Sequence, residues 1–358
     1  MDDGSLLLGR SPNTPPYDGL EPDGVSALDG DPVPPRVSFS LGGVRVDVGG
    51  ADPPLVAELA RVLGGPGPAV AEPTFTFRVV PPEDGLSRIE FDGQEAAPIE
   101  DEFRLGLESP EFPFQEVASD LPGFLALAFR DHAEPLFYAR GGDCRFRRVS
   151  AWRTAVALLL FHRILGLRSD AIFFHAATVG IAGRGVLLIG RKGAGKSTTA
   201  LALAARGHEF LGDETAGFVP ATGQVIPMRR PVGIKPGPRA HALQAGLAAA
   251  GRSPEDEGPL RLDVEELLQV GAARPLPLEA VVFLAPFELQ PELIRIQPGR
   301  EEISQLQPVV SSMVNAGRTR RVFELARMLS SIRTFRLAPG EPDATAAHVE
   351  EALLAAWE

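Results

Sequence analysis

Apolar and polar residues alternate along short segments in the first half of the chain, which is typical of β-strands with one buried face. VSFSL and VRVDV alternate in this way on both sides of Gly42-Gly43 and predict a β-hairpin. The next segment, DPPLVAELARVLGG, predicts a helix with Asp52 as its N-cap and Gly64 at its end. We therefore expect a β-rich N-terminal region over residues 37–149. Its further strands are predicted at 75–80, 87–93, 123–131, 134–140 and 144–149.

The pattern changes at residue 150. The segment SAWRTAVALLLFHRILG is apolar nearly all round, which predicts a buried helix from an N-cap at Ser150 to an end at Gly166. Beyond it strands and helices alternate, and this rhythm predicts an α/β domain over residues 150–358. A hairpin is expected around Thr222-Gly223. The other strands are expected at 171–179, 185–190, 208–214, 281–287, 293–298 and 335–339, and the helices at 196–207, 262–270, 301–314, 318–332 and 343–357.

Residues 1–36 are dense in proline, glycine and aspartate, and such a composition predicts a disordered tail. The chain begins with acidic residues and a short apolar run, Leu6 to Leu8, whereas a secretory signal has a basic start and a longer apolar stretch. The longest apolar segment, 155–161, is far shorter than the roughly 20 residues that span a bilayer. We expect a cytoplasmic protein that does not bind membranes.

Charge and composition narrow the function further. The formal net charge of -12 argues against binding to nucleic acid, which requires a basic surface. The single cysteine, Cys144, excludes an internal disulfide and a cysteine-based metal cluster. The chain has 35 basic residues, and only Lys192, Lys196 and Lys235 among them are lysines. Two of these three lysines lie in one glycine-rich segment.

That segment, GRKGAGKS, has the pattern G-x-x-x-x-G-K-[ST] of a phosphate-binding loop, between a predicted strand and a predicted helix. Glycines let the backbone bring its N–H groups onto phosphate oxygens, and the helix N-terminus adds its positive end. Lys196 is expected to reach the β- and γ-phosphates, Ser197 to bind Mg²⁺ and Thr198 to contact the α-phosphate. ATP and Mg²⁺ are the expected cofactors. The predicted nucleotide-binding residues are Gly190, Arg191, Lys192, Gly193, Ala194, Gly195, Lys196, Ser197 and Thr198.

Two acids, Asp213 and Glu214, follow Lys196 by 17 and 18 residues, at the end of the next predicted strand. A strand–helix–strand unit places both strand ends at one edge of the sheet, where ligands bind. There one acid can hold Mg²⁺ and another can accept a proton from an attacking hydroxyl. A solvated acidic turn is the alternative. The sequence contains neither an LSGGQ-like segment nor the guanine-reading N-K-x-D, so transporter-type ATPases and GTPases are disfavoured.

The segment GAGKSTTALALAARGHEFLGDE resembles two kinase families, the small-molecule kinases of the shikimate and gluconate type and the HPr kinase/phosphorylases. In the second family a histidine follows a strand some twenty residues before the loop lysine, and R-G-H follows the loop helix. His175 precedes Lys196 by 21 residues, and residues 206–208 read R-G-H. The HPr-kinase resemblance therefore covers roughly residues 171–214. The shikimate-type kinases do not need the strand that carries His175.

The resemblance to HPr kinases implies an α/β fold, with a P-loop kinase domain of the HPr-kinase/PEP-carboxykinase type preceded by the β-rich N-terminal region. It implies transfer of the γ-phosphoryl group of ATP to a Ser or Thr hydroxyl of a protein or peptide. Asp213 would then activate the hydroxyl, with His175 close by to tune it. Glu214 matches the second acid, which is an aspartate in that family, and would join Ser197 and Asp213 at the metal.

The chain departs from that family at PMRRPVGIKPG, residues 227–237, where HPr kinases carry an E-I-R-G-L-G-like signature with a metal-binding glutamate. This segment resembles instead the divergent HPr-kinase-related proteins. Arg229, Arg230 and Lys235 are candidates for contact with the γ-phosphate or the substrate. Three alternatives stay open: a shikimate-type kinase with an arginine-rich lid at 317–327, a kinase of another hydroxyl metabolite, and a nucleotide-binding sensor or scaffold. The sequence names neither the acceptor nor the oligomeric state.

Overall fold

The computed structural model shows both strands and helices, which confirms the predicted α/β class. The chain divides into two units between residues 33 and 34, and the described residues all belong to the second unit. The predicted tail, Ser150, Lys235 and most of the helices predicted at 262–270 and 301–314 lie outside the described residues. The structure describes residues 36–64, 74–92, 114–130, 132–148, 152–234, 260–262, 264, 268, 273–302 and 318–358.

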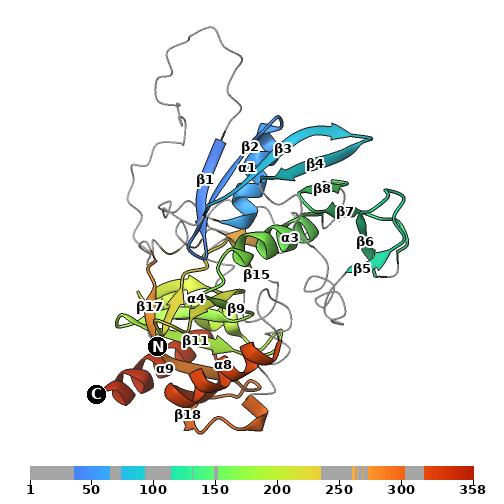
Figure 1. Ribbon diagram of the computed structural model, residues 1–358. Helices are drawn as coiled ribbons and strands as arrows, with labels where there is room; N and C mark the ends of the chain where they lie inside the picture. The colour runs from blue at the N-terminus through green and yellow to red at the C-terminus, as the bar shows by residue number, and fades with distance from the viewer. Residues whose placement is uncertain are drawn as a thin grey trace, which may run out of the picture. The chain divides into compact units, whose positions relative to one another are not determined.

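The first sheet has eight strands in the order β1-β2-β3-β4-β8-β7-β6-β5 (Figure 1). The predicted hairpin is confirmed, because β1 and β2 pair antiparallel and Gly42 and Gly43 turn the chain with φ angles of 59° and 78°. The four residues of β5 were not predicted as a strand, since so short a segment shows little alternation. The strands are β1 (Arg36–Leu41), β2 (Val44–Gly50), β3 (Thr74–Glu83), β4 (Leu86–Phe91), β5 (Phe114–Val117), β6 (Leu125–Phe129), β7 (Phe137–Arg140) and β8 (Asp143–Phe146).

Helices α1 (Pro53–Leu63) and α3 (Trp152–Gly166) pack against this sheet and against each other. The Asp52 side chain accepts a hydrogen bond of 3.0 Å from the backbone N–H of Leu55, so α1 has the predicted N-cap. α1 ends at Gly64, also as predicted. The apolar faces of both helices and the inner side chains of the strands form one core.

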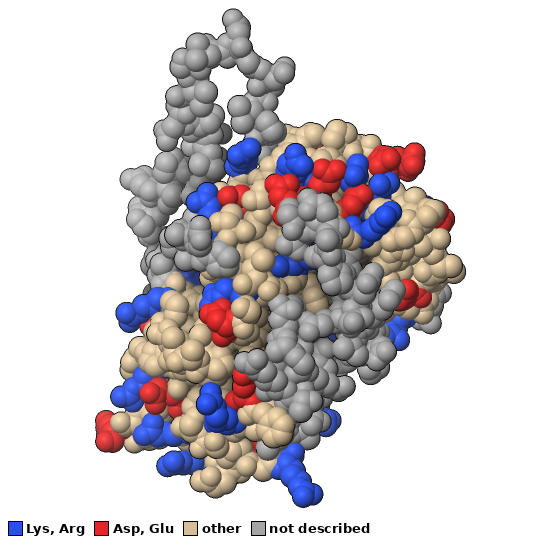
Figure 2. Space-filling model, viewed as in Figure 1, with Lys and Arg blue, Asp and Glu red and all other residues tan. Residues whose placement is uncertain are grey.

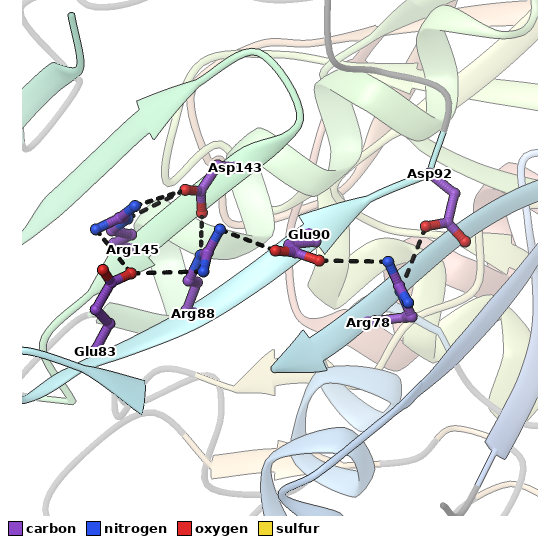
Figure 3. A network of polar contacts seen from close by, with 7 residues as sticks. All are labelled: Arg78, Glu83, Arg88, Glu90, Asp92, Asp143 and Arg145. Carbon is purple, nitrogen blue, oxygen red and sulfur yellow. Dashed lines mark hydrogen bonds and ion pairs between the residues drawn. The ribbon is translucent and has the colours of Figure 1, made fainter. Parts of the chain in front are cut away.

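Charged side chains occupy the other face of β3, β4 and β8, where they alternate with buried apolar residues. Arg88 and Arg145 are paired directly opposite each other on β4 and β8, an arrangement that is unfavourable for like charges. Asp143 lies 3.0 Å from each of them, and Glu83 contacts both at 3.5 and 3.1 Å. Figure 3 shows these side chains as one network that also includes Glu90, Arg78 and Asp92.

The second sheet has nine strands, seven of them in the order β12-β10-β11-β17-β14-β13-β9, with β19 paired to β17 and β18 paired to β19. β10 is antiparallel to both β11 and β12, whereas β17 is parallel to β11 and β19 is parallel to β17. The carboxyl ends of β11, β12, β17 and β19 therefore lie at one edge. The strands are β9 (Ile172–Phe174), β10 (Ala177–Ile181), β11 (Arg184–Ile189), β12 (Glu209–Gly212), β13 (Ala216–Val219), β14 (Gln224–Ile226), β17 (Leu276–Leu284), β18 (Glu292–Ile296) and β19 (Arg333–Ala338).

The single strand predicted over residues 171–179 is wrong, because the structure breaks it at His175 into β9 and β10. β9 pairs with β13, while β10 pairs with β11 and β12. Both halves are apolar and buried, so their composition carries no sign of the break. The hairpin predicted around Thr222-Gly223 is confirmed by the antiparallel pair β13 and β14.

Helices α4 (Lys196–Ala205) and α9 (Pro342–Trp357) pack against each other and share an apolar core with the second sheet. Helix α8 (Arg318–Ser331) overlaps residues 317–327, the segment proposed from the sequence as an arginine-rich lid. A separate pair of short strands, β15 (Val232–Ile234) and β16 (Leu260–Leu262), completes the described elements. Among the described residues, no helix has the length and apolar character needed to cross a membrane.

Candidate functional site

The glycine-rich loop connects the carboxyl end of β11 to the first turn of α4. Gly193 and Gly195 have φ angles of 86° and 97°, a region that residues with a Cβ atom rarely adopt. At Gly190 the limit is space, since a Cβ atom there would lie 3.0 Å from the Cβ of Ala194 and 3.1 Å from that of Leu284. These glycines are therefore required by the turn itself, and the turn presents the N-terminus of α4 at the edge of the sheet.

Lys196 is the first residue of α4, and its side chain folds back over the loop. The residue is only 6% exposed, and its ammonium donates hydrogen bonds to the carbonyl oxygens of Gly190 at 2.8 Å and Arg191 at 3.3 Å. Ser197 and Thr198, in the same turn, are half-buried, whereas Arg191 and Lys192 are exposed. The structure thus holds a cation inside the loop, where an anion bound to the backbone N–H groups would meet it.

The two acids follow β12 directly, and a β-bulge precedes them. Thr178 of β10 is opposite Gly212, but its neighbour Val179 is opposite Phe210, so Leu211 is an extra residue in β12. A bulge of this kind bends a strand and redirects the side chains beyond it. A Cβ atom at Gly212 would lie 2.8 Å from the carbonyl oxygen of Met228. The tight approach places the segment after β14 beside the acidic turn.

Asp213 joins the acidic turn to the loop. Its carboxyl lies near the hydroxyl of Ser197. Burial raises the pKa of Asp213, and the charge of Glu214 adds to that rise; the Ser197 hydroxyl and Arg230 act in the opposite direction, and the resulting pKa is about 6. The structure therefore brings Ser197 and Asp213 together at one edge of the sheet, and the aspartate ionises less readily than an exposed one.

His175 lies in the break between β9 and β10 and contacts the same turn. Its Nδ1 is 2.7 Å from the carbonyl oxygen of Glu214. A carbonyl oxygen can only accept, so Nδ1 carries the proton, and in the neutral ring the lone pair lies on Nε2. The interaction holds the backbone next to Asp213, which places His175 in contact with the acidic turn although 39 residues separate the hydrogen-bonded partners.

Arg230 connects the acidic turn to the helices on the first sheet. Its Nη1 lies 3.3 Å from the Glu214 carboxylate, and its guanidinium carbon lies 4.0 Å from the centre of the Phe161 ring in α3. Its Nη2 is 3.5 Å from the carbonyl oxygen of Val62 in α1. Neither Phe161 nor Val62 was predicted from the sequence as part of the site. No motif near Arg230 could reveal Val62, because 168 residues separate the two.

Arg229 and the R-G-H segment contact neighbouring elements of the fold. The Nε of Arg229 donates to the carbonyl oxygen of Phe210 at 2.6 Å, a bond that ties its segment to β12. Two members of R-G-H contact α9: Arg206 lies 2.7 Å and His208 3.4 Å from the Glu350 carboxylate. Arg206 is the main cause of a lowered pKa of Glu350, which burial opposes. R-G-H therefore holds α4 and β12 to α9. Lys235 lies outside the described residues.

Within the described ranges no three His, Cys, Asp or Glu side chains converge in a way that could hold a metal ion. A transition metal or a protein-enclosed calcium ion normally requires such a cluster. Mg²⁺ does not, because it takes one or two carboxylates and completes its shell with water and phosphate oxygens. Ser197, Asp213 and Glu214 fit that limited set of donors.

Comparison with known proteins supports an HPr-kinase relationship for the part of the chain that holds this site. Residues 168–230 match the family model of the HPr Serine kinase C-terminal domain. The HPr kinase/phosphorylase of Bacillus cytotoxicus is 33% identical over 96 residues, which are 27% of this chain and 28% of that protein. The chain thus matches little more than a quarter of that relative's length.

Among solved structures, the Hpr(Ser) kinase/phosphatase from Coxiella burnetii covers 52% of this chain and 99% of its own, at 15% identity and a TM-score of 0.26. The family match includes His175, the loop, the acidic turn and Arg230. The resemblance inferred from the sequence is therefore confirmed, and the chain is HPr-kinase-like over residues 168–230.

Proposed function

We propose that residues 150–358 form a P-loop kinase domain that transfers the γ-phosphoryl group of ATP to a Ser or Thr hydroxyl of a protein or peptide. The β-rich region over 37–149 precedes that domain. The closeness of Ser197 and Asp213 carries this proposal, because it brings a phosphate-binding loop and a candidate base into one site. Phosphoryl transfer requires these two elements side by side.

The loop supports the binding of a nucleotide triphosphate. Its glycine-dependent turn exposes backbone N–H groups at the start of α4, and the dipole of that helix favours an anion there. The Lys196 ammonium donates to two loop carbonyl oxygens. We expect it to turn toward the β- and γ-phosphates of bound ATP. Exposed Arg191 and Lys192 add positive charge at the rim of the loop.

Ser197, Asp213 and Glu214 would hold Mg²⁺ at the phosphates. Bound there, the ion supplies charge neutralisation to the phosphate oxygens. The Ser197 hydroxyl lies near the Asp213 carboxyl, so the two residues could reach the same metal ion.

Asp213 is the proposed acceptor of the proton that the substrate hydroxyl loses. It is close enough to the loop to meet a hydroxyl that approaches the γ-phosphate. His175 and Arg230 position it by holding the backbone and the side chain of Glu214. No covalent intermediate on the protein is needed, since positioning and charge account for catalysis.

The acceptor class rests on the relatives. Their names describe kinases of HPr, which supports a macromolecular acceptor. The signature segment differs here, because residues 227–237 contain no glutamate, so we propose an acceptor other than HPr and no reverse phosphorolysis.

The test is transfer from [γ-³²P]ATP, first to the proteins of a cell lysate and then to a pool of hydroxyl metabolites. We expect the label on protein. Treatment with base then distinguishes the acceptors, because phosphoserine loses its phosphate by β-elimination more readily than phosphothreonine does. Label on a metabolite would replace the proposal with a small-molecule kinase. Bound ATP without transfer to either pool would identify a nucleotide-dependent sensor or scaffold.

A further inference from the structure

An aromatic side chain lies directly beside the loop on a connection that the sequence analysis did not single out. Phe287 follows β17, whose carboxyl end is at the same sheet edge as that of β11. A Cβ atom at Gly195 would lie 3.1 Å and 3.3 Å from two carbons of the Phe287 ring. The ring therefore packs against the residue that precedes α4, while 37% of Phe287 stays exposed.

The backbone that carries Phe287 is held on both sides. The N–H of Ala285 donates to the carbonyl oxygen of Leu337 at 2.7 Å, and that of Glu288 donates to the carbonyl oxygen of Pro339 at 3.0 Å. These two acceptors belong to β19 and to the turn that follows it, at the same edge of the sheet. The position of the ring is thus set by the folded protein before any ligand arrives, which lowers the entropic cost of binding.

We propose that Phe287 is the platform on which the base of the nucleotide stacks when its phosphates occupy the loop. The inference rests on the proposed function and adds to it a residue that recognises the base. Loop N–H groups and Lys196 recognise only phosphate, so they bind any triphosphate alike. The Cζ and Cε1 end of the ring packs on Gly195 and 37% of the residue stays exposed, so part of an aromatic side chain is accessible next to the loop. A planar base can stack on an aromatic side chain, because every base has a π-face.

The alternative is that Phe287 only supports the loop by packing on Gly195. The two roles differ in their dependence on the ligand. Loss of a base platform weakens the binding of ATP and leaves the binding of inorganic tripolyphosphate unchanged, because tripolyphosphate has no base. Loss of a loop support weakens both ligands alike. Comparing the two ligands on one variant therefore separates the roles without any assay of transfer.

The experiment is calorimetric titration of the full chain with Mg-ATP and with Mg-tripolyphosphate. Phe287→Ala should weaken ATP binding about tenfold, in the range found for loss of one stacked base, with tripolyphosphate affinity unchanged. Phe287→Leu keeps an apolar contact with Gly195 and removes the π-face, so it should show the same selective loss; Phe287→Trp should retain ATP affinity. Melting curves check that each variant is folded. If Phe287→Ala does not fold, the comparison of the two ligands is made with Phe287→Leu.

Leu354→Ala is the matched control, because Leu354 has the same exposed fraction of 37%. It lies twelve residues into α9, about 18 Å along the helix from the end nearest the loop edge. Equal loss of both ligands in Phe287→Leu, or an unchanged ATP affinity, would overturn the base platform. A selective loss in Phe323→Ala, at the second exposed phenylalanine among the described residues, would assign the platform to α8 instead. If the native chain binds neither ligand, the proposed function itself fails.

Discussion

The charged network on the first sheet and the acidic turn on the second are both built from carboxylates and arginines, but their charges are arranged differently. In the network, Glu83 and Asp143 each lie between Arg88 and Arg145, so both like-charged arginines are compensated (Figure 3). In the acidic turn, half-buried Asp213 lies beside a second acid, and its pKa is raised to about 6. Charges that are paired on both sides support folding, whereas a carboxyl with a raised pKa near a cation-holding loop is typical of a site that binds or reacts.

The surface over the first sheet is also balanced in charge. On the face drawn in Figure 2, basic and acidic side chains alternate over the strands of the first sheet, as the network of Figure 3 requires. Such interleaved charges leave little net field to attract a charged partner. We therefore expect substitutions in the network to change stability without changing chemistry, and substitutions around the loop to do the reverse. The predictions below test this division.

The largest effect is expected for Lys196→Ala. Removal of the cation held at the loop should lower transfer by about 100-fold or more, because no other described side chain is placed inside the loop to neutralise phosphate charge. Lys192→Ala is the control, since Lys192 is an exposed lysine in the same loop and should cost less than threefold. Transfer assays with both variants measure the difference. Full activity in Lys196→Ala would exclude the loop as the nucleotide site.

Asp213→Asn should lower turnover by about 100-fold to 10,000-fold, because an amide cannot accept the proton of the substrate hydroxyl. The loop and Lys196 are unchanged in this variant, so the affinity for ATP should change by less than about tenfold. Turnover and ATP titration are measured on the same preparation. Loss of ATP binding together with a lowered melting temperature would instead assign Asp213 a structural role.

A smaller kinetic effect is expected for His175→Ala, which removes the hydrogen bond to the Glu214 carbonyl oxygen. The acidic turn then loses one of its supports, and turnover should fall about tenfold with the affinity for ATP retained. His175→Asn offers an amide N–H in place of Nδ1 and should recover part of the rate. A collapse of the melting curve in both variants would show that His175 serves the core of the sheet and not the site.

In the network, Asp143→Asn leaves Arg88 and Arg145 opposite each other with only Glu83 between them. The free energy of unfolding should fall by about 1 to 2 kcal/mol, because Asp143 is partly buried and bonded to both arginines. Asp92→Asn, at the more exposed end of the network, should cost only a few tenths of a kcal/mol. Denaturant unfolding measures both. If Asp143→Asn lost turnover at a temperature where it is folded, the network would affect catalysis as well as stability, contrary to the prediction.

Apart from the control variants, the smallest effect is expected at the N-cap of α1. Asp52→Ala should lower the free energy of unfolding by about 1 kcal/mol, whereas Asp52→Asn keeps a side-chain oxygen for the Leu55 N–H and should cost less. Burial raises the pKa of Asp52, but the Leu55 N–H and Arg148 outweigh it, so the net pKa is lowered. The stabilisation is therefore present above the ordinary value of 3.8 and is lost as the pH falls through the lower folded value.

Denaturant unfolding of the native chain and the two Asp52 variants across this pH range checks the sign. The difference between native and alanine variant should shrink as the carboxylate is protonated. A difference that grows toward acid pH would show that Asp52 is held as the neutral form.

Local features followed from the sequence alone because their causes lie within a few adjacent residues. The cap at Asp52, the turn at Gly42-Gly43 and the hairpin around Thr222-Gly223 each depend on the conformational preference of one or two residues. The glycine-rich loop depends on a fixed spacing between a strand and a helix, and the structure has that strand and helix. The net charge of -12 and the single cysteine are read from composition alone, and they argue against nucleic-acid binding and an internal disulfide.

The tertiary structure decided how distant segments pair. The break at His175, the bulge at Leu211 and the contacts of Arg230 with α1 and α3 all arise from pairing between strands or helices that lie far apart in the chain. Burial then sets the pKa of Asp213, and burial is a property of the folded chain. The place of Phe287 beside Gly195 has the same origin, since two parallel strands bring their ends together only when the sheet forms. Composition and spacing determined which groups were available, and the sheet determined which of them meet.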